Sequence, residues 1–319
     1  MRRFRARPTA FMDSWPASDA MNEAGRLKDK VAIVTGGARG VGRAVARAFA
    51  AEGATVVIAD YGVELDGTQP AAAPLERTVA VIAASGGRAH ASFTDVAVED
   101  QVEELFSRTI DRFGRLDILV NAAAVMRQGS ISKTSRADWD EQMRVNVGGT
   151  FNTTRVAAAH WIGAGTGGRL LNFGSDAGLK GVGAAVAYSV SKAAVINLTL
   201  SCAQTLSAYG VTCNVIHPQA DTRMTASIPR DQLPDADRWA GGEFDPDHVP
   251  PALIYLASDA GGWINGCILA AFGYEVHLYS LGGRAKSIYS EGPWDQQALE
   301  RSIREVFGPT LEVEPSTAR

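Results

Sequence analysis

A tyrosine and a lysine stand four residues apart in the stretch AYSVSKAAV, which runs from Ala187 to Val195. On an α-helix this spacing sets Tyr188 and Lys192 on one face, one turn apart. A free tyrosine ionises near pH ~10, and a neighbouring positive charge is one of the few influences that lower this pKa. The pair therefore has the chemistry of a proton-transfer device, although a half-buried tyrosine and a solvated lysine give the same pattern by chance.

A second chemical signal is the glycine-rich stretch VTGGARGVGRA, residues 34–44. It joins a predicted strand to a predicted helix, where backbone amides and the positive end of the helix dipole attract a phosphate group. Its spacing is TGxxxGxG, with Gly36, Gly40 and Gly42, and differs from the GxGxxG fingerprint. The strand–turn–helix context nevertheless favours a dinucleotide over simple tight packing.

An acidic residue ends the second predicted strand, in VVIAD. A carboxylate at this point receives the ribose hydroxyls of the adenosine, so Asp60 predicts NAD. A 2′-phosphate about 4 Å away would cost roughly 4 kcal/mol per unit charge at an effective dielectric constant near 20. Arg39 is close enough in sequence to approach such a phosphate, which leaves NADP as the less favoured cofactor; Arg39 as a solvated loop charge is the alternative.

The elements that must position these residues alternate along the chain. From residue 31 onward, short β-rich runs alternate with amphipathic helical segments, a pattern typical of βαβ units and a parallel sheet with helices on both faces. We expect one α/β domain with a Rossmann-type, doubly wound, seven-stranded sheet. The predicted strands lie at 31–37, 54–60, 88–96, 116–125, 168–175, 211–218 and 266–273.

Several segments stand outside this plan. Residues 1–26 are expected to be a disordered extension, 27–273 the catalytic domain, and 274–319 a C-terminal extension. A Gly/Pro/Ala-rich insertion follows the second strand at 61–76, and the polar segment 221–248 resembles a lid. The apolar lid residues either line a substrate pocket or anchor the lid to the core; they are Met224, Ile228, Leu233 and Trp239.

The composition gives no reason to expect a macromolecular or membrane partner. The formal net charge is −4, and 46% of the residues are hydrophobic. These values favour a small-molecule substrate over nucleic acid or an anionic membrane. Three separated cysteines indicate reduced thiols and a cytoplasmic protein, and the five histidines have no metal-ligand spacing, which predicts no metal site.

Several of these motifs occur in the order typical of one known family. They are TGxxxGxG at 35–42, Asp95 after the third strand, NAAA at 121–124, Asn146 in VNVGGTF, Ser175, and the Tyr188–Lys192 pair. Over about residues 27–273 the chain resembles the short-chain dehydrogenase/reductase family. This resemblance implies that Tyr188 is the general acid/base and that Lys192 lowers its pKa and binds the nicotinamide ribose. It also implies that Ser175 polarises the substrate oxygen and that Asn146 holds a proton-relay water.

Each assigned role has a structural alternative. Four of the residues have an alternative role that needs no cofactor: Tyr188 can be a core phenol, Ser175 a turn residue, Asn146 a backbone bridge and Asp95 a helix N-terminal residue. The chemistry agrees with the assigned roles, because oxidation of a carbinol requires a base near its oxygen and a donor that steadies it. The resemblance assigns cofactor binding to Gly36, Arg39, Gly40, Val41, Gly42, Asp60, Asp95, Val96, Asn121, Ala122, Ala123, Tyr188, Lys192, Pro218 and Thr222.

The chain departs from the family pattern at two points. The common NNAG is replaced by Asn121 and three alanines, and the common PG by Pro218-Gln219. Neither change removes a reacting group, so they bear on cofactor affinity more than on the reaction type.

The resemblance is strongest to hydroxyacyl-CoA dehydrogenase-like members, through HPQADTRMT and ADYGVELDG. We therefore expect an NAD(P)-dependent oxidoreductase that interconverts a secondary alcohol and a ketone on a fairly large apolar substrate of the hydroxyacyl-CoA, steroid or terpenoid type. The helices that contain Asn146 and Tyr188 resemble those that pair subunits in this family, which implies a homotetramer or homodimer. A lyase or epimerase on the same scaffold and a non-catalytic NAD-sensing protein are the alternatives.

Overall fold

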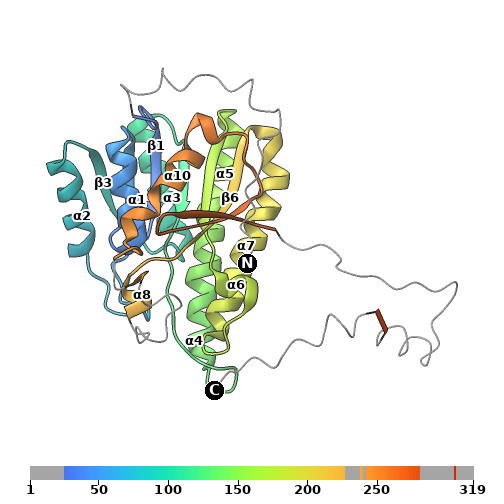
Figure 1. Ribbon diagram of the computed structural model, residues 1–319. Helices are drawn as coiled ribbons and strands as arrows, with labels where there is room; N and C mark the ends of the chain where they lie inside the picture. Colours follow the sequence, from blue (N-terminus) through green and yellow to red (C-terminus); the bar gives the residue numbers. More distant parts are fainter. Residues whose placement is uncertain (1–24, 227–237, 240–241, 281–304, 307–319) are drawn as a thin grey trace. The chain divides into compact units, whose positions relative to one another are not determined.

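Figure 1 shows the computed structural model of the chain, which describes residues 25–226, 238–239, 242–280 and 305–306. The fold described below lies within the unit Met1–Tyr279, and Ser280–Arg319 form a separate unit.

The core of the protein is one eight-stranded sheet with the order β3-β2-β1-β4-β5-β6-β7-β8. The first seven strands are parallel, and the order reverses direction at β1 and β4, as in a doubly wound fold. The parallel strands are β1 (Val31–Thr35), β2 (Thr55–Asp60), β3 (Arg88–Phe93), β4 (Ile118–Asn121), β5 (Gly168–Phe173), β6 (Val211–Pro218) and β7 (Ile268–Phe272).

The predicted count of seven strands was wrong, because an antiparallel strand follows β7. Strand β8 (Glu275–Tyr279) returns after a tight turn at Gly273, which has φ +52°, and pairs with β7 from Phe272 to Ile268. Residues 274 onward are predicted as an extension outside the sheet, and EVHLY lacks the continuous apolar run of the central strands. Val276 and Leu278 are largely exposed, as an edge strand allows.

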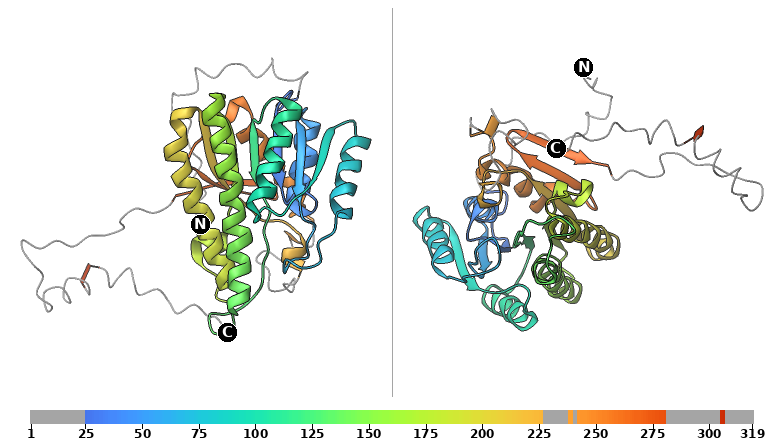
Figure 2. Two further views of the ribbon diagram at one scale, coloured as in Figure 1. Left: turned by 180° about the vertical axis from the view of Figure 1, so that it is seen from behind. Right: turned by 90° about the horizontal axis from the view of Figure 1, so that it is seen from below.

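Helices cover both faces of the sheet (Figures 1 and 2), which confirms the predicted α/β architecture. On one face lie α1 (Gly40–Ala51), α2 (Ala73–Ala84) and α10 (Pro250–Ala257). On the other lie α3 (Glu99–Phe113), α5 (Thr150–Ala164) and α7 (Val186–Leu206). In β1, Ala32 and Val34 pack against the first set of helices and Ile33 against the second, because side chains alternate along a strand.

The helix that precedes β5 is interrupted by a wider turn. Helix α4 (Arg136–Gln142) continues as the π-helix η2 (Met143–Gly149) and then as α5. A single π-helical turn inside an α-helix often occurs at a functional site, since it changes the direction of the side chains on either side. Here it carries Asn146 into the protein interior, where 1% of the residue is exposed.

Helix α7 carries the Tyr188–Lys192 pair and is a long, largely apolar helix. The stretch Val186–Tyr209, which adds the short η3 (Ser207–Tyr209), is long and apolar enough to cross a membrane by length and composition. It also packs against β6 and buries Lys192, as the central helix of a globular α/β fold does. The remaining short helices are α6 (Asp176–Lys180), α8 (Arg223–Ala226), η5 (Pro246–His248) and η6 (Asp259–Gly261).

Candidate active site

A cavity of about 400 Å³ lies at the carboxyl ends of the parallel strands. Ligands of open α/β sheets bind in this place, where neighbouring connections leave the sheet in opposite directions. Most of the predicted site residues line the cavity. They are Gly36, Arg39, Gly40, Val41, Gly42, Asp60, Asp95, Val96, Ala122, Ala123, Ser175, Tyr188, Lys192, Pro218 and Thr222.

Ser175 and Tyr188 both line this cavity, and the Ser175 side chain is near enough to the Tyr188 phenol to act on its pKa. Ser175 follows β5 and caps the N-terminus of α6, where its hydroxyl accepts a hydrogen bond from the Ala177 amide at 3.2 Å. Burial raises the pKa of Tyr188, and Ser175 acts in the opposite direction. The two hydroxyls can therefore share one substrate oxygen, one as a donor and the other as an acid or base.

Lys192 stands beside Tyr188 as its spacing predicts, but its ammonium group is not directed at the phenol oxygen. Nζ donates a hydrogen bond to the Phe173 carbonyl at 2.8 Å and lies 5.8 Å from the centre of the Tyr188 ring. Only 4% of Lys192 is exposed, and burial lowers its pKa from 10.5 to about 8. A cation held in a poorly solvated place acts on its surroundings more strongly than one in water.

Two of the predicted residues, Asn121 and Asn146, are absent from the cavity wall that the described residues form. The Asn146 amide holds the backbone of Val125, accepting from its N–H at 2.9 Å and donating to its carbonyl at 3.0 Å. It also donates to the Ser191 hydroxyl at 3.0 Å. The backbone-bridging interpretation thus describes the Asn146 side chain, which fixes α7 to the segment that follows β4.

Asn121 is used in a similar structural way below the cavity. Its Nδ2 donates to Asn172 at 2.9 Å, and its Oδ1 accepts from the Thr153 hydroxyl at 2.8 Å. These buried polar groups connect β4, β5 and α5, which satisfies their hydrogen bonds inside the core. Contact of the Asn121 side chain with a cofactor therefore has no support from its position, whereas the neighbouring Ala122 and Ala123 do line the cavity.

The glycine turn forms a cradle that fits a pyrophosphate. Gly36 has φ +66°, and a Cβ atom there would lie 2.6 Å from the Ala123 amide nitrogen. A Cβ atom on Gly42 would lie 2.3 Å from the Gly36 carbonyl oxygen. The turn thus closes tightly only without side chains, and it presents the first amides of α1 to the cavity, where an anion is stabilised. The chain's own residues therefore fit the pyrophosphate of a dinucleotide.

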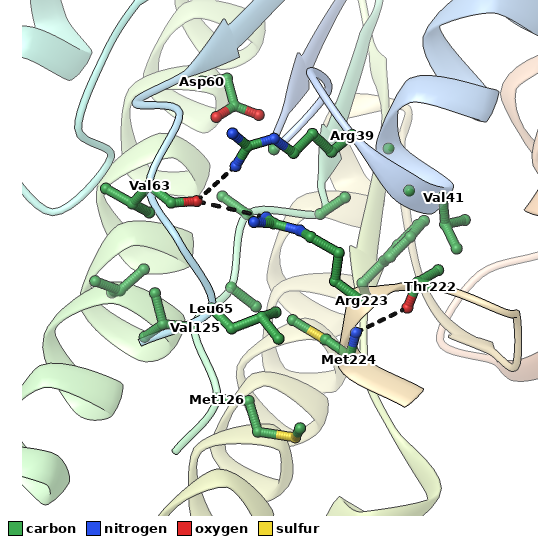
Figure 3. Close-up of a pocket in the computed structure, with 18 of the residues that line it drawn as sticks. Arg39, Val41, Asp60, Val63, Leu65, Val125, Met126, Thr222, Arg223 and Met224 are labelled. Atoms are coloured by element: carbon green, nitrogen blue, oxygen red, sulfur yellow. Dashed lines mark hydrogen bonds between the residues drawn. The ribbon is translucent and has the colours of Figure 1, made fainter. Parts of the chain in front are cut away.

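Asp60 lies at the end of β2, beside this cradle. Its carboxylate accepts hydrogen bonds from the Ala38 amide at 2.8 Å and from the Gly62 amide at 2.6 Å. Each carboxylate oxygen has a further acceptor position, so Asp60 can receive ribose hydroxyls while it holds the turn. Arg39 lies next to Asp60 and directs its guanidinium at the Val63 carbonyl, with a donor–acceptor distance of 2.8 Å (Figure 3).

From the sequence, Asp95 is either a cofactor contact or a residue at the start of a helix, and it lies both at the cavity and in the turn before α3. One carboxylate oxygen accepts from the Ala97 amide at 2.9 Å in the turn before α3, and the other pairs with Arg144 at 2.9 Å. Asp95, Val96 and Arg144 all line the cavity. The resemblance assigns two of them, Asp95 and Val96, to cofactor binding.

The family model described as short chain dehydrogenase matches residues 30–233. The chain belongs to the short-chain dehydrogenase family. It is accordingly an oxidoreductase that acts on CH–OH groups of small molecules with NAD(P) as cofactor.

Two relatives of this short-chain dehydrogenase are named for acyl-CoA substrates. Hydroxyacyl-CoA dehydrogenase ChsB1 of Mycobacterium tuberculosis is 36% identical over 88% of this chain and 89% of its own length. The (2S)-[(R)-hydroxy(phenyl)methyl]succinyl-CoA dehydrogenase subunit BbsD of Thauera aromatica is 35% identical over 81% of this chain and 98% of its own. A crystal structure of a short-chain dehydrogenase from Mycobacterium avium superimposes with a TM-score of 0.78 at 36% identity, covering 89% of this chain and 96% of that one.

Sequence reasoning missed one wall of the dehydrogenase cavity. The first part of the predicted insertion, residues 61–72, is a loop whose Val63, Glu64, Leu65 and Gly67 line the cavity, and α2 begins at Ala73. The composition marked the segment as irregular but carried no signal of where the loop would fold. Its closeness in sequence to Asp60 was the available clue.

The predicted lid is only partly within the described residues. Of the two open alternatives, Met224 follows the first and lines the cavity, whereas Trp239 is 4% exposed and stacks on Phe244 with ring centres 4.2 Å apart. Trp239 is thus an anchor in the core. Ile228 and Leu233 lie outside the described residues.

Proposed function

We propose that this short-chain dehydrogenase uses NAD to interconvert a secondary alcohol and a ketone on a fairly large apolar substrate. The observation that carries the proposal is that Ser175, Tyr188 and buried Lys192 line the same cavity as the glycine cradle. If Tyr188 were only a core phenol and Ser175 only a turn residue, there would be no reason for both to line the cavity that contains the phosphate-binding turn.

The residues of the site divide the proton chemistry of alcohol oxidation among them. NAD, when bound, supplies the acceptor for the hydride that leaves the carbinol carbon. Ser175 donates a hydrogen bond to the substrate oxygen and holds it in place, while Tyr188 accepts the hydroxyl proton. Because burial raises the pKa of Tyr188, its phenolate form depends on nearby positive charge, and Lys192 supplies a buried cation on the same helix face. In the reverse direction Tyr188 returns the proton to the ketone oxygen.

The preference for NAD rests on the charges around the ribose end of the cavity. Asp60 presents a carboxylate where a 2′-phosphate would lie, and Arg39 is engaged by the Val63 carbonyl and by Glu64, 3.6 Å away. A like-charge contact of this kind is unfavourable by several kcal/mol at most and by less where solvent screens it. Arg39 is therefore poorly placed to neutralise an added phosphate.

A hydroxyacyl-CoA is the substrate type that we favour, with steroid or terpenoid alcohols as the wider class. Two relatives carry names of CoA-thioester dehydrogenases. Val125, Met126 and Met224 also line the cavity, and their flexible or branched apolar side chains suit an acyl or ring system (Figure 3).

We also propose a homotetramer or homodimer in the cytoplasm. Large apolar side chains are exposed on the two helices that the resemblance implicates in subunit pairing: Phe151 and Ile162 on α5, and Val190 on α7. Exposed apolar side chains on these two helices favour association between copies. Light scattering of the purified protein gives the oligomeric state directly.

The decisive experiment is a panel of 3-hydroxyacyl-CoA, steroid, terpenoid and short-chain secondary alcohols with NAD, followed by the absorbance of NADH. Tyr188→Phe should bind NADH as the wild type does and should lose turnover by about 10²- to 10⁴-fold. Product formed without net NADH would indicate a lyase or epimerase. NADH binding without turnover on any substrate of the panel would favour the NAD-sensing alternative.

A further inference from the structure

Glu64 forms a charged bridge in the loop that walls the cavity. Its carboxylate lies 3.6 Å from Arg39 Nη2 through one oxygen and 2.9 Å from Arg223 Nη1 through the other. Both arginines also approach the Val63 carbonyl oxygen, Arg39 at 2.8 Å and Arg223 at 3.4 Å (Figure 3). One short stretch of the loop thus engages a cation from the glycine turn and another from α8.

This bridge stands at the ribose end of the cavity. Arg39 immediately precedes α1 in the glycine turn, and Asp60 holds the same turn through the Ala38 amide at 2.8 Å. Asp60 also accepts from the Gly62 amide at 2.6 Å, which fixes the start of the loop that carries Glu64. Figure 3 shows Asp60, Arg39 and Arg223 gathered around Val63. An added phosphate beside Asp60 would therefore lie next to both arginines.

The charges at this end of the cavity decide which dinucleotide can be accepted. Two guanidinium groups without nearby acids would attract a phosphate strongly, because arginine pairs with phosphate oxygens through charge-assisted hydrogen bonds. Glu64 supplies a carboxylate to both of them, and the Val63 carbonyl supplies a further acceptor. With Asp60 as the single acid, the two arginines would leave one excess positive charge. With Glu64 as a second acid, the four charges balance.

We propose that Glu64 is a nucleotide-selecting residue: by pairing with Arg39 and Arg223 it withholds both arginines from a 2′-phosphate, so that the site accepts a dinucleotide with a free 2′-hydroxyl. This inference rests on the proposed function, since it assumes that a nicotinamide dinucleotide occupies the cavity. Glu64 would thus be a second determinant of nucleotide choice, beside Asp60. Glu64 lies in the loop after β2 and acts by pairing with the two arginines, whereas Asp60 lies in β2 and acts by repelling the phosphate.

A purely mechanical role for Glu64 makes a different prediction. If the carboxylate only anchored the loop, its loss would loosen one wall of the cavity and weaken both nucleotides by a similar factor. If it withholds the arginines, its loss frees them and strengthens NADPH alone. The ratio of the two dissociation constants separates these roles, and it does so without reference to turnover.

The test uses the full-length protein and follows the fluorescence of NADH and NADPH on binding. Glu64→Gln should tighten NADPH by about tenfold or more, as one charge-assisted contact to phosphate contributes, and should change NADH binding by less than about threefold. The gain should shrink in 0.5 M salt, since these groups are partly exposed. Glu64→Gln combined with Arg39→Ala should lose much of the gain. Glu103→Gln, which removes an equal charge from a surface pair with Arg155, should leave the ratio unchanged.

Three outcomes would overturn the proposal. They are equal weakening of NADH and NADPH in Glu64→Gln, an unchanged ratio in that variant, and a wild type that binds NADPH as tightly as NADH. A wild type that binds neither nucleotide would instead contradict the proposed function, so the two failures are distinguishable.

Discussion

The Nε2 atom of His217 accepts a hydrogen bond from the backbone amide of Asp176 at 2.9 Å. Asp176 directly follows Ser175, so this bond ties the end of β6 to the turn that presents Ser175 to the cavity. His217 is 8% exposed, and its Nδ1 atom has no hydrogen-bond partner among the described residues. His217 also lines the cavity, and we propose that it positions Ser175 through the backbone at the start of α6.

Replacing His217 should therefore impair turnover more than cofactor binding. His217→Leu removes the acceptor of the Asp176 amide, which lets the Ser175 turn move, and we expect kcat to fall by about tenfold or more because small displacements of a catalytic group are costly. His217→Gln, whose side-chain oxygen can accept the same bond, should keep more of the activity. NADH binding should stay within about threefold in both variants, as fluorescence titration measures. Equal activity of the leucine and glutamine variants would contradict a positioning role.

The same residue should make stability depend on pH. Burial lowers the pKa of His217 from 6.5; the Asp176 charge opposes this shift and Lys180 adds to it. Tyr279 packs against the same ring, with centres 5.8 Å apart. Because the folded-state pKa is depressed, the stability that depends on neutral His217 is complete above about pH 6.5 and is lost as the pH falls toward that lowered value. The free energy of unfolding of the wild type should therefore fall relative to that of His217→Gln between pH 7.5 and 5.5, in urea titrations. A constant difference would exclude this linkage.

The sequence predicted the parts of the site that depend on local pattern. Three features could be predicted because each depends on residues close together in sequence: the Tyr188–Lys192 spacing on one helix, the glycine turn, and the acid at the end of β2. The structure brings all three into one cavity. The direction of the Lys192 ammonium toward Phe173 did not follow, because it depends on how closely α7 packs against β5. Strand β8 was missed for a related reason, since an exposed edge strand lacks an apolar run.

Long-range contacts set the remaining differences. Asn146 turns into the interior because a π-helical turn redirects it, and such a turn has no reliable sequence signature. Glu64 reaches Arg223 across 159 positions of sequence. Pairings of this kind come from tertiary packing and not from residue propensity, so only the composition of 61–76 hinted that the segment was irregular.

The buried charge of Lys192 is expected to lower the free energy of unfolding of the protein. A pKa of about 8 in place of 10.5 corresponds to roughly 3 kcal/mol of unfavourable burial of the charged form at pH 7. Lys192→Met keeps the stem and removes the charge, but also removes the hydrogen bond to Phe173, so we expect a net gain of about 1–2 kcal/mol in the free energy of unfolding at pH 7. Turnover should fall by about 10²-fold or more.

Between pH 8 and 10.5 the unfolded state binds more protons than the folded state does, so the wild type should become more stable as the pH rises. Lys192→Met should not show this gain. Thermal and urea unfolding across this range measure both effects, and a less stable Lys192→Met at pH 7 would contradict the interpretation.

Two glycine-to-alanine changes should act in opposite directions. Gly36→Ala places a Cβ atom 2.6 Å from the Ala123 amide nitrogen at φ +66°, which L-residues adopt at a cost of about 1–2 kcal/mol before the clash is counted. It should lower the free energy of unfolding by about 2 kcal/mol or more and weaken NADH binding by about tenfold or more, since the cradle for the pyrophosphate must open.

Gly163, in the last turn of α5, is exposed, and a Cβ atom there would meet no described atom within 4 Å. Gly163→Ala should therefore stabilise the protein by about 0.5–1 kcal/mol and leave NADH binding unchanged. If Gly36→Ala bound NADH as tightly as Gly163→Ala does, the glycine turn would not be the phosphate cradle, because the close approach of Gly36 to Ala123 would then serve packing alone.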